Sequence, residues 1–135
     1  MTRLAAFVYD DGGRAAAGFQ GVTGDCVVRA IAIACQLDYR DVYDELHRRA
    51  GKSPRSGVHR AVYQPFLAGL GWRWVPTMSI GSGTTVHLRH DELPGGRIIA
   101  RCTRHLVAVI DGDVHDIGDP TRGGTRAVYG YFTEA

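Results

Sequence analysis

The most chemically informative feature of the sequence is a cysteine that follows a glycine-punctuated polar loop. Residues 20–26 read QGVTGDC and run directly into residues 27–34, an apolar stretch of helical length. A helix that is apolar on nearly every face is a buried helix, so Cys26 should begin one. The unpaired N–H groups and the positive dipole at a helix N-terminus favour a thiolate over a thiol. The sequence therefore predicts a reactive cysteine at position 26.

The same segment offers hydrogen-bond donors for an oxyanion. A carbonyl attacked by Cys26 would develop negative charge beside the backbone N–H of that residue, and the side-chain amide of Gln20 could donate a second bond. Asp25 acts in the opposite direction, because a carboxylate that points toward the sulfur raises the pKa of the thiol. We therefore assign the oxyanion hole to Gln20 and Cys26, and we expect Asp25 to oppose the thiolate if it points inward.

A nucleophilic cysteine needs a base, and the base needs a group that orients it. His105 begins the apolar segment 105–110, which runs into an Asp-Gly pair typical of a β-hairpin turn. If residues 111–113 form a three-residue loop, Asp119 lies opposite His105, where cross-strand Cβ atoms are ~4.5–5.5 Å apart. If the turn has only two residues, Asp116 lies diagonal to His105 on the same face. Both registers are consistent with the spacing.

These segments resemble those of the papain-like cysteine peptidases. The QGxxGxC pattern before a buried helix is similar to their cysteine segment. The strand that begins at His105 and precedes Asp119-Pro120 resembles the small bacteriocin-leader (double-glycine) peptidases and other compact bacterial and phage members. The resemblance extends over about residues 18–120. The chain differs from papain in having Asp25 and Val27 beside the cysteine, where a small residue and an aromatic residue are usual.

The resemblance implies a cysteine hydrolase that cleaves a peptide or isopeptide bond through a thioacyl intermediate. It implies Cys26 as the nucleophile, His105 as the base and Asp119 as the orienting residue, with Asp116 as the alternative. It implies a peptide or protein substrate. An acyltransferase or deamidase would use the same triad and differ only in the acceptor. A non-catalytic protein-binding module on the same fold is the third hypothesis, and Asp25 is the residue that favours it.

The order of apolar patterns predicts helices followed by strands, which is typical of the α+β class. We expect helices over residues 26–36, 38–50 and 58–70, and strands over residues 4–9, 72–75, 97–102, 105–110, 114–117 and 126–132. Pro65 inside the third helix predicts a late start or a kink. The resemblance implies a single papain-like domain over residues 1–135, in which the central buried helix with Cys26 packs on a C-terminal antiparallel sheet.

Composition limits the classes of partner. A hydrophobic content of 44% with 22% charged residues is typical of a globular protein, and no apolar run approaches the ~20 residues of a membrane span. The net charge of +2 is too small to indicate a nucleic-acid partner.

The odd count of three cysteines indicates reduced thiols and a cytoplasmic protein, with Cys35 and Cys102 as core residues. Cys102-x-x-His105 lacks a second ligand pair, so we expect no metal or other cofactor.

Overall fold

We describe a computed structural model of the chain, which covers residues 3–20, 24–78 and 85–135. The helices are α1 (Cys26–Cys35), α2 (Tyr39–Ala50) and α3 (Arg60–Gly69), with a 3-10 turn η1 (Pro54–Ser56). The strands are β1 (Phe7–Tyr9), β2 (Trp72–Pro76), β3 (Val86–His87), β4 (Arg97–Cys102), β5 (His105–Ile110), β6 (Asp113–Asp116), β7 (Ala127–Val128) and β8 (Gly130–Glu134). The fold is α+β, as predicted. Residues 21–23 of the predicted cysteine loop lie outside the described residues.

Six strands form one sheet in the order β1-β6-β5-β4-β8-β2, and β3 pairs with β7 in a second, two-stranded sheet. Every pair in the large sheet is antiparallel except the one between β1 and β6. Parallel strands need a long connection, and here all three helices lie in the chain between the two partners. The sequence predicted a strand over residues 4–9 but not its parallel partner.

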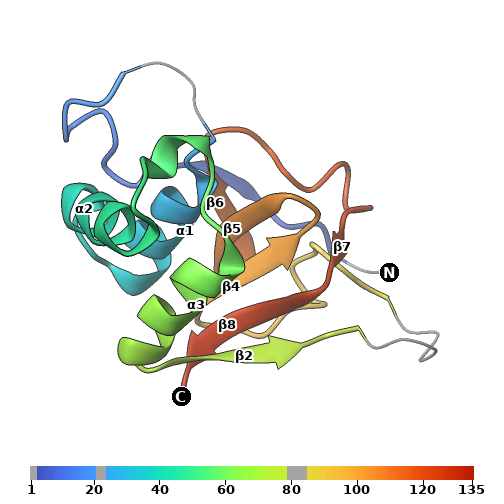
Figure 1. Ribbon diagram of the computed structural model, residues 1–135. Helices are drawn as coiled ribbons and strands as arrows, with labels where there is room; N and C mark the ends of the chain where they lie inside the picture. The colour runs from blue at the N-terminus through green and yellow to red at the C-terminus, as the bar shows by residue number, and fades with distance from the viewer. Residues whose placement is uncertain (1–2, 21–23, 79–84) are drawn as a thin grey trace.

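Helix α1 is the centre of the main core. Every residue from 27 to 34 is buried, which agrees with the predicted central helix. In Figure 1 the helices gather on one side of the large sheet, and α1 lies against β5 and β6 behind α2. The core between helices and sheet includes Val28, Ile31, Leu46, Leu67, Ile99, Leu106, Ala108 and Phe132. The N-terminus of α1 is thereby fixed beside the beginning of β5.

The opposite face of the sheet is covered as well, by the segments that carry β3 and β7. Its apolar cluster is made of Leu88, Leu93, Ile98, Ala100, Cys102, Val107, Val109, Val114 and Val128. Central strands β4 and β5 therefore bury both faces, and that explains why their sequences are almost continuously apolar. Cys102 shares this cluster with Ile98 and Ala100, as the alternation along β4 predicted.

Helices α2 and α3 lie within the ranges that the sequence predicts. The Asp38 carboxylate accepts hydrogen bonds from the backbone N–H groups of Arg40 and Asp41, and Gly51 ends α2 in the left-handed conformation with φ 71°. Helix α3 begins at Arg60, later than the predicted residue 58, and continues through Pro65. Among the described residues, no helix is both long and apolar enough to cross a bilayer.

The strand predicted over residues 126–132 is divided between the two sheets. Residues 127–128 pair with β3, whereas β8 begins at Gly130 and pairs with β2 and β4. A Cβ atom at Gly130 would collide with the indole ring of Trp74. Glycine is therefore required where the chain passes from the small sheet into the large one.

Candidate active site

Cys26 is the first residue of α1, where the sequence predicted it. Its side chain is half-buried and lies beside the beginning of β5. The first N–H groups of a helix have no partner within it, and the Asp25 side chain supplies no capping bond. The thiol is therefore next to backbone donors that are available to an anion. This is the environment in which a cysteine becomes a nucleophile.

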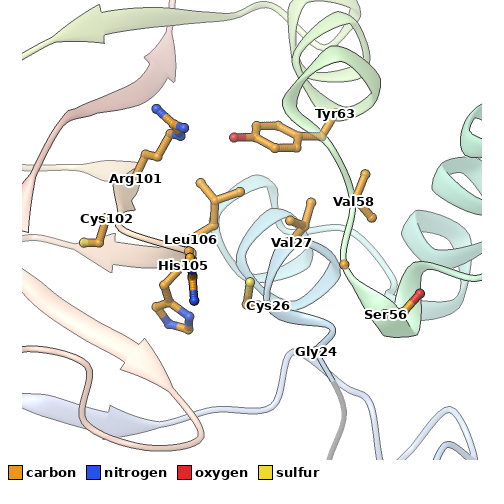
Figure 2. A pocket seen from close by; sticks show the side chains of 12 residues that line it. Gly24, Cys26, Val27, Ser56, Val58, Tyr63, Arg101, Cys102, His105 and Leu106 are labelled. Atoms are coloured by element: carbon orange, nitrogen blue, oxygen red, sulfur yellow. The ribbon is translucent and has the colours of Figure 1, made fainter.

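His105 is the partner of Cys26. The imidazole and the thiol lie together at the mouth of one cavity (Figure 2). Burial acts to raise the pKa of Cys26, but hydrogen bonds from His105 and from the Leu106 backbone N–H outweigh it and lower that pKa. Burial likewise opposes the imidazolium, yet the hydrogen bonds with Asp116 and Cys26 raise the pKa of His105 to about 9. Each group therefore stabilises the charge of the other.

Asp116, and not Asp119, orients the imidazole. The distance from His105 Nε2 to Asp116 Oδ2 is 2.6 Å, which leaves Nδ1 as the ring nitrogen for the thiol. Burial of the Asp116 carboxyl raises its pKa, but the bonds with His105, the Ile117 backbone N–H and the Arg29 charge lower it overall. The carboxylate of Asp119 instead accepts bonds from the backbone N–H and the hydroxyl of Thr121. The prediction that Asp119 is the orienting residue is therefore wrong.

The turn between β5 and β6 explains this correction. Asp111 and Gly112 have φ of 50° and 85°, and Ile110 pairs with Asp113. The hairpin therefore has a two-residue turn with two left-handed positions, the type that matches the twist of the strands. In this register Asp116 is diagonal to His105 on the same face. It is the alternative register that the spacing left open.

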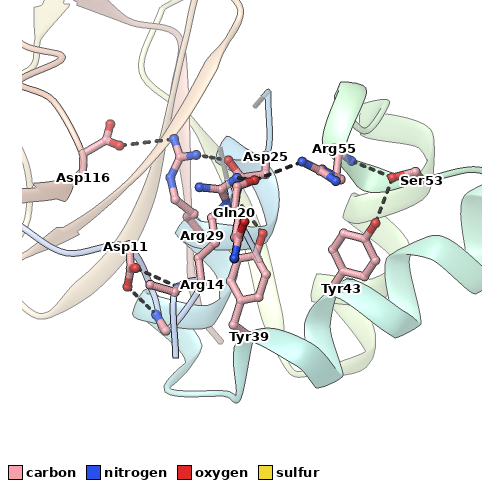
Figure 3. Close-up of polar contacts among 12 residues, drawn as sticks. Asp11, Arg14, Gln20, Asp25, Arg29, Tyr39, Tyr43, Ser53, Arg55 and Asp116 are labelled. Atoms are coloured by element: carbon pink, nitrogen blue, oxygen red, sulfur yellow. Dashed lines mark hydrogen bonds and ion pairs between the residues drawn. The ribbon is translucent and has the colours of Figure 1, made fainter. Parts of the chain in front are cut away.

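Asp25 does not face the sulfur. Its buried carboxylate binds the guanidinium of Arg29, accepts a bond of 2.7 Å from the Tyr39 hydroxyl, and lies 3.1 Å from Arg14 Nε (Figure 3). Two cations and a hydroxyl therefore satisfy it. The condition under which Asp25 was expected to oppose the thiolate is therefore not met, because its carboxylate belongs to a buried ion cluster.

Arg29 joins that cluster to the proposed triad. Its Nη1 atom binds Asp25, and its Nη2 atom lies 3.4 Å from Asp116 Oδ1. The side chain is buried, and its Nε atom has no hydrogen-bond partner among the described residues. A continuous chain of contacts therefore runs from Asp25 through Arg29, Asp116 and His105 to Cys26. Arg29 is the one charged residue in the apolar segment 27–34, and its spacing of four residues from Asp25 is the signal in the sequence for this pair.

Gln20 is not brought to the site. Its side chain is exposed, and it is absent from the described residues that line the two cavities beside Cys26. Its backbone carbonyl accepts bonds from Arg14 at 3.0 Å and Arg55 at 3.1 Å. The contribution of its amide to an oxyanion hole therefore stays a prediction. The other predicted donor, the N–H of Cys26, belongs to the first turn of α1, where it has no partner within the helix.

Two cavities open on either side of the Cys26–His105 pair. One, of about 360 Å³, has apolar walls from Val27, Val58 and Leu106, with Tyr63 and Arg101 at its far side (Figure 2). The other, of about 370 Å³, extends past Asp116 toward Pro120 and Arg126. Arg104 lines both cavities. An extended chain could therefore lie across the thiol with a side chain in each cavity.

The remaining thiols lack the environment of Cys26. Burial, with a smaller contribution from the charge of Glu134, raises the pKa of Cys35 to about 12. Burial raises that of Cys102 to about 11. His87 lies 3.3 Å from Glu92, and His90 lies 3.2 Å from Asp113. The described residues contain no cluster of three or more histidine, cysteine, aspartate or glutamate side chains suited to a metal ion.

Comparison with known proteins identifies no relative. No protein-family model matches the chain, and neither a curated protein nor a solved structure matches it. The chemistry of this site is therefore argued from its own geometry.

Proposed function

We propose that the chain is a cysteine amide hydrolase with Cys26 as its nucleophile. The observation that carries this proposal is the arrangement of three groups: a thiol with a lowered pKa at a helix N-terminus, an imidazole whose pKa is raised, and a carboxylate 2.6 Å from that imidazole. A nucleophile, a base in contact with it and a group that orients the base are the parts that acyl transfer requires.

The reaction begins with attack of the Cys26 thiolate on an amide carbon. A C–S bond forms, and the backbone N–H of Cys26 donates a hydrogen bond to the oxygen that gains negative charge. The His105 imidazolium gives its proton to the amine nitrogen as the C–N bond breaks, which leaves a thioacyl enzyme. His105 then takes a proton from water as the water oxygen attacks, and the C–S bond breaks to release a carboxylic acid.

Asp116 would hold the imidazole throughout this cycle. A carboxylate on Nε2 keeps Nδ1 directed at the sulfur and stabilises the imidazolium whenever it forms. Because Arg29 also binds Asp116, the carboxylate has a second anchor that fixes its position. The burial of Asp25 removes the feature that favoured a non-catalytic binding module, since its charge is neutralised within the cluster.

The proposed relationship is to the papain-like cysteine peptidases, and to their compact bacterial and phage members. Three features support it. Cysteine, histidine and aspartate follow one another in that order along the chain. The cysteine begins a buried central helix, and the histidine begins a strand of the sheet that packs on this helix. We further propose that the protein acts in the cytoplasm on peptide or protein substrates, because such chemistry requires reduced thiols.

The test is cleavage of a complex peptide mixture. We expect the protein to generate new N-termini in a peptide library, detected by mass spectrometry, and we expect Cys26→Ala to generate none. Cys35→Ala is the matched control, because it removes a thiol from the same helix outside the site. Products that carry a water-derived carboxylate support hydrolysis, whereas products joined to added amines support acyl transfer. Equal cleavage patterns for the protein and Cys26→Ala would contradict the proposal.

A further inference from the structure

Three arginines that have no carboxylate partner among the described residues lie around the Cys26 site. Arg101 and Arg104 line the first cavity, and Arg104 and Arg126 line the second. Asp116 is the only carboxylate among the described residues that line either cavity, and it already binds His105 and Arg29. The walls of this cleft therefore carry an excess of positive charge.

None of these three arginines has a carboxylate partner in the described part of the chain. Arg101 lies 5.9 Å from the centre of the Tyr129 ring, and the Tyr63 hydroxyl points toward it in Figure 2. Arg126 donates to the backbone carbonyls of Thr103 at 2.6 Å and Pro120 at 3.4 Å, and the described residues provide no hydrogen-bond partner for its buried Nε. The side chain of Arg104 forms neither an ion pair nor a hydrogen bond with any described residue. By contrast, Arg29 in the same region binds two carboxylates.

The backbone holds Arg104 in an unfavourable conformation. It has φ of 54° at the tight turn that joins β4 to β5, next to His105. The left-handed region favours glycine or asparagine, so an arginine there costs conformational energy. Residues held in such conformations are concentrated at sites that bind or react. This turn directs an arginine to the edge of both cavities.

Stabilisation of the thiolate does not account for these charges. The cations that lower the pKa of Cys26 are His105 and Arg29. Arg101 lies at the far side of the first cavity, beyond apolar walls formed by Val27, Val58 and Leu106. Arg104 precedes His105 directly and lines both cavities. An aliphatic stem could pack on those walls while a carboxylate at its end reaches a guanidinium, which is the geometry that arginine binds best.

We propose that the substrates of this site carry a carboxylate next to the reacting amide, bound by Arg101 and Arg104. This inference rests on the proposed cysteine hydrolase function. The carboxylate could belong to a glutamate or aspartate side chain or to the C-terminus of a short peptide, and the two share the same recognition chemistry. Arg126 extends the positive surface along the second cavity.

Alkylation of Cys26 by two matched reagents tests the charge of the cleft without a known substrate. Iodoacetate and iodoacetamide both form an S–C bond to the thiolate and release iodide, but only iodoacetate is an anion. The ratio of their rate constants at Cys26 cancels changes in the thiolate fraction. We expect Arg101→Gln with Arg104→Gln to lower this ratio about three- to tenfold, with a smaller effect at high salt. Arg73→Gln, an exposed change on β2 at a residue that lines neither cavity, is the control for loss of positive charge away from the site.

The outcomes separate this inference from the proposed function. If Cys26 reacts with neither reagent faster than a cysteine in an unfolded peptide, the nucleophile itself is absent and the hydrolase proposal fails. If Cys26 is reactive but the ratio is the same in the double variant as in Arg73→Gln, the carboxylate inference fails and the hydrolase proposal stands.

A binding measurement identifies the source of the carboxylate. Calorimetry with the full-length Cys26→Ala chain would compare acetylated peptides that carry glutamate or glutamine, each with a free or an amidated C-terminus. Preference for glutamate assigns the site to an acidic side chain, and preference for the free terminus assigns it to a C-terminal carboxylate. Equal binding of all four peptides would overturn the inference. Loss of the preference in the arginine double variant, but not in Arg73→Gln, would support it.

Discussion

Asp116 lies diagonal to His105 across the β5–β6 hairpin, and its Oδ2 atom is 2.6 Å from Nε2 of the imidazole. This contact depends on the length of one turn. A hairpin with one more turn residue would move Asp116 to the opposite face, because successive side chains in a strand alternate. The two-residue turn at Asp111-Gly112 therefore places the carboxylate of Asp116, and not that of Asp119, beside His105.

Replacement of each candidate carboxylate by an amide tests which of the two acts on His105. Asp116→Asn should lower kcat/KM by about 10²-fold or more, because the imidazolium loses its charged partner. Asp119→Asn should affect catalysis little, since that carboxylate binds only Thr121 among the described residues. The measurement is kcat/KM on a peptide selected from the cleavage library, with circular dichroism to verify folding. A greater loss in Asp119→Asn than in Asp116→Asn would refute the assignment.

Hydrolysis and alkylation should differ in their dependence on pH. Both need the Cys26 thiolate, whose pKa is lowered, so both should already proceed below the usual range for a cysteine. Only hydrolysis also needs the imidazolium, which is lost as pH rises through about 9. We therefore expect hydrolysis to fall above about pH 9 while iodoacetamide labelling persists. A hydrolysis profile that continues to rise beyond this pH would exclude His105 as the proton donor.

The same titration should appear in stability. The pKa of His105 is raised from 6.5 to about 9 in the folded protein, so the folded state binds its proton more tightly than the unfolded state. The contribution is complete below pH 6.5 and is lost as pH rises through about 9. Urea unfolding should therefore show a decline in unfolding free energy across this interval that is absent in His105→Gln. An identical decline in both proteins would assign it to other groups.

The three cysteines should label at separate rates. At about pH 6 an ordinary cysteine is almost wholly protonated. Iodoacetamide should nevertheless modify Cys26, while Cys35 and Cys102, whose pKa values are raised to about 12 and about 11, should remain unmodified. His105→Ala should slow labelling of Cys26 by removing the hydrogen bond that favours the thiolate. Peptide mass spectrometry assigns each site, and equal labelling of Cys26 and Cys35 would show that the ion pair is not formed.

Asp25 should matter for stability more than for thiol reactivity. Asp25→Asn leaves the buried guanidinium of Arg29 with one carboxylate partner in place of two, and breaking a buried pair costs about 3–5 kcal/mol. We therefore expect a large decrease in unfolding free energy, measured with urea. Asp44→Asn is the matched control, since Asp44 is exposed on α2. If the two variants are equally stable, the cluster does not hold α1 in place.

Much of this protein was determined by local sequence. Position 26 is the start of α1 because an apolar run follows a glycine-containing loop, and α2 ends at Gly51 because glycine adopts the left-handed conformation at no steric cost. His105 begins β5 because a tight turn precedes a continuous apolar run. Such features depend on backbone preference and apolar periodicity within a few residues, which a single sequence displays directly. Cys26 and His105 could therefore be named before the fold was known.

Only the tertiary structure decided which carboxylates lie beside Cys26 and His105. Asp116 and Asp119 were both compatible with the spacing, and the hairpin register chose Asp116. Asp25 was adjacent to Cys26 in sequence, yet its carboxylate turned to Arg29 and Tyr39 because burial requires a charge to be paired. These choices depend on contacts between segments up to 87 residues apart, such as Arg29 with Asp116. Charge pairing between residues so far apart in sequence is fixed by packing, and the residues next to each partner do not indicate it.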